Sequence, residues 1–236
     1  MSGLTPSGWG RPALRGLDVQ GLVGHLIGVE QDFHTTLGMS TLAPVITDHV
    51  ASTQPHAVAQ AGRPYTETHR EWRAVADLTL EHLGGLADAD LQAPVTLHGL
   101  TLPLTSMLTV RFFEMWTHEE DIRRAVGAEL VAPGPDRLMH MTQLAMALLP
   151  HGMARINRAH PGLTTRLVLT GPGGGTWSIS DEPVARPADA VIVADAVGFC
   201  RLVANRIDPN ALSAVVTGQE ELAADVLAGA RALALD

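Results

Sequence analysis

A helical run near the middle of the chain sets the strongest constraint on the fold. Residues 111–124 read RFFEMWTHEEDIRR, with Glu114 and His118 four positions apart. On a helix this spacing places a carboxylate and an imidazole on one face, one turn apart. The surrounding aromatic residues make that turn apolar, and a buried carboxylate without a partner costs several kcal/mol. A cation removes that cost, so the pattern predicts two ligands of one metal ion.

A third candidate ligand lies far upstream in the apolar segment 22–27, which reads LVGHLI. His25 is the only ionisable side chain in that segment. One histidine from one helix, together with Glu-x-x-x-His from another, gives the three-ligand set with an open position that catalytic zinc uses. The alternative is a core histidine satisfied by a hydrogen bond, beside an ordinary Glu-His pair on an exposed helix. The spacing alone leaves both interpretations open.

Two motifs resemble one known family. Residues 16–26 read GLDVQGLVGHL and resemble the GWTVRDLVAHL signature of the mycothiol-dependent maleylpyruvate isomerase family, within the DinB-like metalloproteins. Residues 111–124 resemble that family's second motif, R-x-x-E-x-W-x-H-x-x-D-I-R-R. The resemblance implies zinc, or another divalent metal, held by His25, Glu114 and His118. Leu17 stands where the family has tryptophan, a change that we expect to affect packing rather than chemistry.

The resemblance also implies mycothiol as a thiol cosubstrate and an arginine of the carboxy-terminal domain that faces the metal. Arg206 matches that position, and its guanidinium suits a carboxylate-bearing substrate through a bidentate pair. Arg201 is hard to distinguish from it by sequence, and an ordinary surface arginine is the alternative for both. Arg206 is the predicted catalytic residue.

Two further residues flank the predicted ligands. Arg111 lies three positions before Glu114 and Asp121 three after His118, so both reach the same helix face. Asp121 is expected to hold the ring of His118 as a hydrogen-bond acceptor; a surface Arg-Asp network is the alternative. The remaining histidines have no partner at metal spacing and are interpreted as surface or core residues: His34, His49, His56, His69, His82, His98, His140, His151 and His160.

The predicted fold class is α+β. A DinB-like helical bundle over residues 1–130 is followed by a smaller mixed α/β domain over residues 131–236. The family has a helix before its first histidine motif, but only 17 residues precede Asp18 here and they are rich in proline and glycine. Either the start is misassigned or another helix fills that place, and residues 49–60 are the nearest candidate.

Apolar periodicity and turn residues locate the elements. Asp18 and Asp136 are expected to cap helices, Gly127 is expected to end one, and residues 91–104 are expected to form a loop. The expected helices are 18–33, 65–83, 105–126, 136–157, 196–205 and 220–234. The expected strands are 166–170 and 176–180, paired as a hairpin, followed by 190–193 and 214–216.

Composition excludes several classes of protein. The chain has 236 residues, of which 46% are hydrophobic and 17% charged, as in globular proteins. A net charge of −9 without a basic stripe argues against nucleic-acid binding. No apolar run is long enough to span a bilayer and no signal segment begins the chain, so a cytoplasmic protein without a membrane partner is expected. Cys200 is the only cysteine, which excludes a disulfide framework and a cysteine-based zinc site.

All 16 basic residues are arginine. This usage indicates a GC-rich genome and suits an actinobacterial host, the group in which mycothiol is the main small thiol; mutational bias without functional meaning is the alternative.

Two functions remain in view. The first is a zinc-dependent enzyme in which the mycothiol thiolate adds to a small electrophilic, carboxylate-bearing substrate. The outcome is isomerisation if the thiol is later expelled and S-transfer if it stays. The alternative is a non-catalytic DinB-like metal-binding or stress-associated protein. The sequence predicts neither the electrophile nor the oligomeric state.

Overall fold

The computed structural model describes residues 3–40, 45–180 and 187–234. The chain forms two compact units, Met1–Val131 and Ala132–Asp236. The first is mainly helical and the second combines helices with a four-stranded sheet, so the protein is α+β. Among the described residues no helix is long and apolar enough to cross a membrane.

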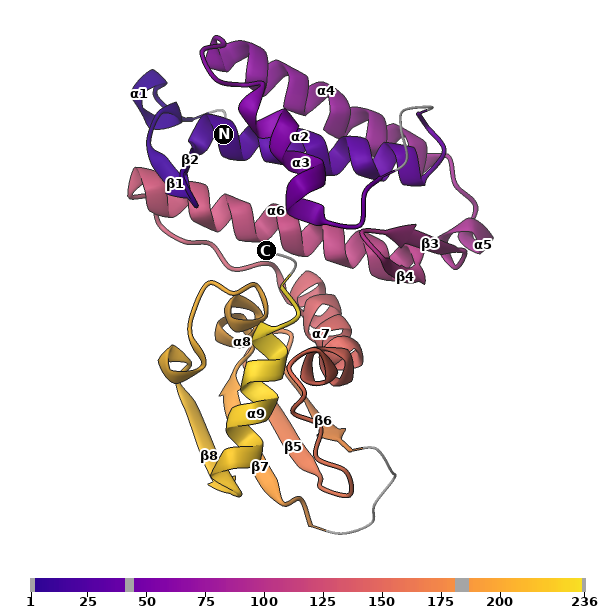
Figure 1. Cartoon of the computed structure of the whole chain (residues 1–236), viewed down its shortest axis with the longest axis vertical. Helices are drawn as coiled ribbons and strands as arrows, with labels where there is room; N and C mark the ends of the chain where they lie inside the picture. Colours follow the sequence, from indigo (N-terminus) through magenta and orange to yellow (C-terminus); the bar gives the residue numbers. More distant parts are fainter. Residues whose placement is uncertain (1–2, 41–44, 181–186, 235–236) are drawn as a thin grey trace. The chain divides into compact units, whose positions relative to one another are not determined.

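The first unit is built around one central helix. Helix α2 (Val19–Thr36) packs against α3 (His49–Val58), α4 (Tyr65–Gly84) and α6 (Leu104–Val126) (Figure 1). As predicted, Asp18 caps α2: its carboxylate accepts a hydrogen bond of 2.7 Å from the backbone N–H of Gly21. Helix α3 lies within the segment 49–60 that the sequence offered as the nearest candidate for another bundle helix.

Two glycines allow α3 to approach α2 closely. A Cβ on Gly24 would lie 2.7 Å from the carbonyl oxygen of His56, and one on Gly28 would lie 3.1 Å from the Cα of Thr53. Because Gly24 and Gly28 flank His25 on the same helix, they bring the backbone of α3 next to the His25 side chain. Because of this close approach, residues of α3 surround the predicted metal ligand His25.

The prediction of a loop over residues 91–104 is wrong. After the short helix α5 (Asp88–Leu91), strands β3 (Pro94–Leu97) and β4 (Leu100–Pro103) form an antiparallel hairpin. The turn residues His98 and Gly99 have φ of 48° and 77°, which is the left-handed pairing that a tight hairpin requires. Pro94 and Pro103 face each other at the open end of the hairpin.

Short elements precede α2. They are α1 (Pro6–Trp9), β1 (Pro12–Leu14) and β2 (Leu17–Asp18), and the two strands pair antiparallel. The prediction that no long helix lies before Asp18 agrees with these elements. At the other end of the unit, Gly127 adopts φ 69° and ends α6, as predicted.

The second unit begins with α7 (Pro135–Arg155). Its N-cap is Gly134, so the prediction that Asp136 caps this helix is wrong. Proline is favoured at the first helical position because its missing N–H has no intrahelical partner there. The helix therefore starts at Pro135, one residue before the expected start. Asp136 lies in the first turn, where its negative charge interacts favourably with the positive end of the helix dipole.

The sheet of the second unit has the strand order β6-β5-β7-β8. Its strands are β5 (Thr165–Thr170), β6 (Gly175–Ile179), β7 (Ala190–Asp195) and β8 (Ala214–Gly218). The predicted hairpin of β5 and β6 is confirmed, whereas β5 and β7 run parallel. Helices α8 (Ala196–Val203) and α9 (Glu220–Arg231) pack against the sheet, and the 3-10 turn η1 spans Pro209–Ala211 (Figure 1).

The close contact of α2 and α3 makes a stability prediction. Gly24→Ala forces a Cβ against the His56 carbonyl, so we expect the free energy of unfolding to fall by about 1–3 kcal/mol despite the better helix propensity of alanine. Gly84→Ala in α4 is the matched control, because no atom lies within 4 Å of its added Cβ. Urea denaturation of both variants measures the effect. Equal stability of Gly24→Ala and the parent would show that the close approach is not required.

Candidate metal centre

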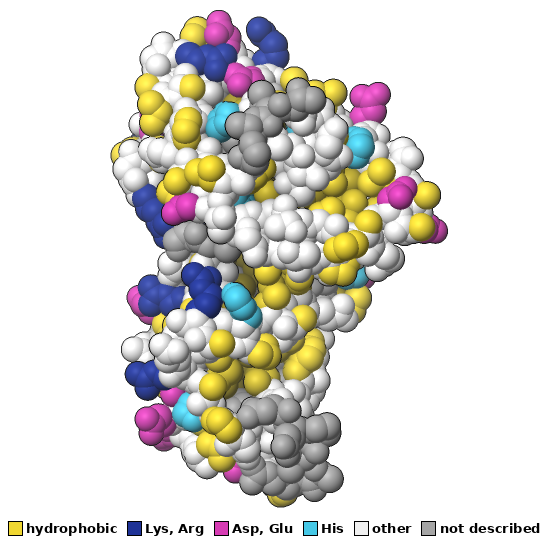
Figure 2. Space-filling view, turned by 45° about the vertical axis from the view of Figure 1, so that its right-hand side comes forward, with side chains coloured by type: hydrophobic (Ala, Val, Ile, Leu, Met, Phe, Trp, Pro, Cys, Tyr) yellow, Lys and Arg dark blue, Asp and Glu magenta, His cyan; other side chains and the backbone are white. Residues whose placement is uncertain are grey.

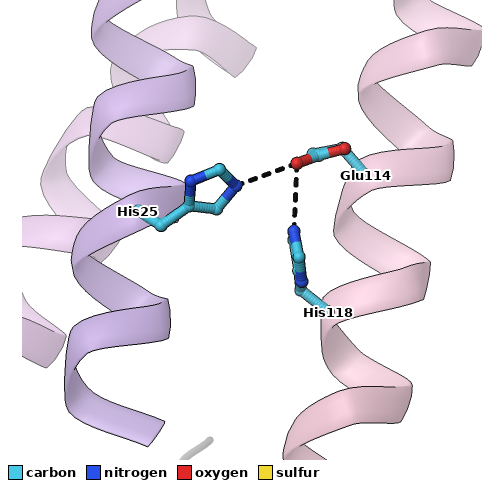
Figure 3. Close-up of side chains that lie close together, drawn as sticks. All are labelled: His25, Glu114 and His118. Atoms are coloured by element: carbon cyan, nitrogen blue, oxygen red, sulfur yellow. Dashed lines mark hydrogen bonds and ion pairs between the residues drawn. The ribbon is translucent and has the colours of Figure 1, made fainter. Parts of the chain in front are cut away.

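Three side chains from two helices meet inside the first unit. His25 comes from α2, and Glu114 and His118 come from α6; all three point into the space between these helices (Figure 3). The Nε2 atom of His25 lies 2.9 Å and that of His118 3.0 Å from the same carboxylate oxygen, Oε1 of Glu114. One ligand atom from each residue lies within 4.8 Å of the other two, a separation that one metal ion can bridge.

The other ring nitrogen of each histidine has its own acceptor. His118 Nδ1 lies 3.0 Å from Oδ2 of the buried Asp121, which is the contact that the sequence spacing predicted. His25 Nδ1 lies 2.8 Å from the hydroxyl of Thr53, and that hydroxyl donates its single proton to the His49 carbonyl oxygen at 2.9 Å. Both imidazoles therefore carry a proton on Nδ1 and direct Nε2 toward Glu114. This is the arrangement of metal-bound histidines, whose second nitrogen donates to a neighbouring acceptor.

The group favours a positive charge at its centre. Two Nε2 lone pairs directed at a carboxylate oxygen repel it unless a proton or a cation lies between them. Burial alone would lower the pKa of the His118 imidazole, but Glu114 and Asp121 outweigh burial and raise that pKa to about 9. Burial opposes ionisation of Glu114, yet His118 and the imidazole hydrogen bonds hold its pKa well below the ordinary value.

His25 differs from His118 in its protonation. Burial lowers the pKa of His25, and the nearby Glu114 carboxylate offsets this only in part. A neutral imidazole is the form that binds a metal. The residues fit a divalent cation, which would replace the Nε2 proton of His118 and have two imidazole nitrogens and one carboxylate oxygen as donors.

His25, Glu114 and His118 are less exposed to solvent than a cluster of surface carboxylates would be. Figure 2 shows acidic side chains dispersed over this face of the molecule among polar and hydrophobic ones. The side chain of His118 is 4% exposed, whereas those of His25 and Glu114 are 12% and 22% exposed. The donors are therefore largely withdrawn from solvent, with Glu114 the most exposed of the three.

His49 is a site residue that the sequence analysis missed. His49 is buried, as one of the two interpretations from the sequence expected, but its Nε2 also lies 3.1 Å from Oε1 of Glu114, a contact that the sequence did not predict. Residue spacing reveals ligands only when they lie on the same helix. Glu114 and His118 share α6, whereas His49 belongs to α3. The signal that was available is the glycine pair at 24 and 28 around His25, which indicates a second helix packed closely against this one.

Arg111, which the spacing placed on the helix face of the ligands, pairs with a carboxylate of another helix. Its guanidinium donates to the fully buried Glu30 of α2, and Thr79 of α4 donates to the same carboxylate. This network joins α6, α2 and α4 beside the metal group. Arg111 therefore stabilises the packing of the helices that carry the ligands instead of contacting Glu114.

The two candidate arginines lie in the second unit. Arg201 occupies the last turn of α8, and Arg206 follows the helix and donates to the carbonyl oxygen of Ala204 at 2.8 Å. The catalytic role of Arg206 stays a prediction.

A cavity of about 660 Å³ lies on a neighbouring face of α6. Its walls include Leu26, Trp72, Met115 and Ile122. Met115 follows Glu114 on α6, and one residue turns a helix by about 100°. His25, Glu114 and His118 are not among its lining residues, so the cavity adjoins the metal ligands without including them.

Comparison with known proteins identifies the family. The family model described as the mycothiol maleylpyruvate isomerase N-terminal domain matches residues 1–123, a span that contains all three candidate ligands. The chain belongs to the mycothiol maleylpyruvate isomerase family. No match was found among curated protein sequences.

Two crystal structures share the fold. One is of the mycothiol-dependent maleylpyruvate isomerase, with 15% sequence identity and a TM-score of 0.59. The other is of a histidine-to-alanine mutant of such an isomerase, with 14% identity and a TM-score of 0.52. Each alignment covers 90% of this chain and 84% of the other. At this identity the likeness establishes a common fold.

The donor set makes a direct prediction about metal content. Protein purified without added metal should contain close to one equivalent of a divalent ion, and His118→Ala should contain close to none, because it removes a ligand whose orientation Asp121 fixes. Elemental analysis gives the stoichiometry. His140→Ala, which removes an exposed histidine of α7, is the control and should keep the parental content. Equal metal in His118→Ala and the parent would contradict the assignment.

Proposed function

We propose that this member of the family is a metal-dependent, mycothiol-using enzyme that isomerises, or transfers the thiol to, a small electrophilic substrate bearing a carboxylate. Zinc is the proposed metal. One observation carries the proposal: His25 and His118 both direct Nε2 at Glu114 while Thr53 and Asp121 hold their Nδ1 atoms. Membership of the family supports the choice of thiol and reaction class.

His25, Glu114 and His118 would hold the ion. Three protein ligands are typical of catalytic zinc sites, in which the fourth position takes water or substrate. When bound, zinc lowers the pKa of a coordinated thiol, so that the nucleophilic thiolate is present near neutral pH. The partial exposure of His25 and Glu114, against the burial of His118, supports approach of the thiol past the first two residues.

The chain's own residues orient and enclose the donors. Asp121 and Thr53 fix the two imidazole rings, so that no ring has to rotate when a ligand binds. The Glu30–Arg111 contact holds α6 against α2 and keeps the donors on facing sides. Precise placement of a nucleophile lowers the entropic part of a reaction barrier.

The proposed reaction is addition of sulfur to a conjugated carbon–carbon double bond. The sulfur electron pair forms a C–S bond, and the π electrons move to the carbon next to the activating carbonyl group. Rotation about the resulting single bond, followed by loss of the thiolate and return of the electrons, gives the geometric isomer. If that carbon takes up a proton instead, the thiol stays attached and the outcome is S-transfer. The balance between these outcomes depends on the substrate.

The thiol step is tested spectroscopically. In protein loaded with Co²⁺, addition of mycothiol should produce a sulfur-to-cobalt charge-transfer band in the near ultraviolet, and the zinc form should convert conjugated unsaturated acids only when the thiol is present. Glu114→Ala should lose the band and turnover together, because it removes a metal donor. A metal-loaded parent without a band and without turnover on any conjugated acid would instead favour the non-catalytic metal-binding alternative.

The predicted role of Arg206 has its own test. Addition of a thiolate builds negative charge on the substrate, and a guanidinium is suited to stabilise it. Arg206→Ala should therefore keep its metal and lose roughly 10²–10³-fold in kcat, the loss typical for removal of one such donor. Arg201→Ala, also made in the second unit, is the matched control and should retain activity. Loss of activity only in Arg201→Ala would assign the role to that residue.

A further inference from the structure

We propose that His49 is a positioning residue of the metal centre: it donates its Nε2–H to Glu114 and holds this carboxylate in its ligand orientation, without binding the metal itself. The inference rests on the proposed function, because it concerns the same site. It adds a residue that neither the sequence motifs nor the family comparison identified.

The hydrogen-bond pattern distinguishes His49 from the two histidine ligands. His25 and His118 have acceptors that hold a proton on Nδ1, so in the metal-bound form their Nε2 lone pairs would face the ion. Among the described residues the buried Nδ1 of His49 has no hydrogen-bond partner that would hold a proton there. Its Nε2 lies 3.1 Å from the Glu114 carboxylate, and a lone pair at that place would be repelled. The ring is therefore in the opposite tautomer, with its proton on Nε2.

Distances support a donor rather than a fourth ligand. Within the described part of the chain, the donor atoms that lie within 4.8 Å of one another belong to His25, Glu114 and His118, and His49 is outside this set. A carboxylate oxygen has two lone pairs. One lone pair could bind a metal while the other accepts the His49 proton. Oε1 of Glu114 could therefore make both contacts at once.

The ring of His49 is held on two sides by other histidines. Its centroid lies 5.1 Å from that of His25 and 4.7 Å from that of His98, and both contacts are edge-to-face. His98 is fixed in turn, because its Nδ1 donates to the carbonyl oxygen of Ile46 at 3.1 Å and its backbone adopts the left-handed turn of the β3–β4 hairpin. The hairpin that the sequence analysis missed therefore supports His49, and through it Glu114.

Two substitutions separate donor, ligand and packing roles. His49→Leu removes the N–H group and keeps an apolar side chain, whereas His49→Gln restores an N–H donor on a side chain that does not replace imidazole as a ligand. The probe is Co²⁺: its affinity is measured by competition with a chelator, and its visible absorption reports the coordination number. Denaturation of the metal-free variants measures folding separately.

We expect His49→Leu to bind Co²⁺ about 10–100-fold more weakly, the loss typical when a group that orients a ligand is removed. His49→Gln should recover most of that affinity with a parental spectrum. Parental affinity in His49→Leu would overturn the proposal. A changed coordination number in His49→Gln would also overturn it and make His49 a ligand. If His49→Leu fails to fold, His49→Gln still decides between these outcomes.

The same measurements distinguish this proposal from the proposed function. Thiol-dependent turnover of the parent, with unchanged Co²⁺ affinity in His49→Leu, would remove the role of His49 and leave the enzyme assignment intact. Absence of turnover in the parent, with weakened affinity in His49→Leu and rescue in His49→Gln, would remove the enzyme assignment and leave the positioning role intact.

Discussion

The structure of the first unit depends on one largely buried carboxylate, that of Glu114, which requires positive charge around it. One oxygen of Glu114, Oε1, lies 2.9, 3.0 and 3.1 Å from the Nε2 atoms of His25, His118 and His49. These contacts come from three different helices, so the electrostatic requirement of one side chain is met only when α2, α3 and α6 are assembled. The contacts that form the site therefore also hold the three helices together. Loss of the positive charge beside Glu114 should weaken both metal binding and helix packing.

Close backbone packing makes this arrangement possible. Gly24 and Gly28 bring α3 against α2, and α3 supplies both the acceptor for His25 and the donor for Glu114. On the other side, the buried contact of Glu30 with Arg111 holds α2 against α6. Buried charge pairs are costly to break, because one partner is then left uncompensated. The ligand geometry is set by helix packing rather than by flexible loops.

The sequence predicted contacts correctly where all the residues involved lie on one helix or one hairpin. Glu114, His118 and Asp121 share one helix, so their spacing predicted the contacts that the structure shows. Regular helices and the β5–β6 hairpin also followed from periodicity and glycine positions. His25 required either the family resemblance or the argument from a lone histidine in an apolar run, since no local rule links it to residues about ninety positions away. Errors arose where tertiary contacts or turn geometry decide, as at His49 and at the hairpin turn of His98 and Gly99.

The central claim is that two imidazoles and one carboxylate hold a metal ion, and X-ray absorption spectroscopy at the metal edge of the protein as purified tests it most directly. The account predicts scattering from two imidazole rings, with nitrogen and oxygen donors at roughly 2.0–2.2 Å for zinc. In His25→Gln loaded with zinc, the imidazole multiple-scattering signal per bound ion should fall by about half, because one of the two rings contributed by the ligand set is removed. A spectrum of oxygen donors alone, or one unchanged by His25→Gln, would contradict the account.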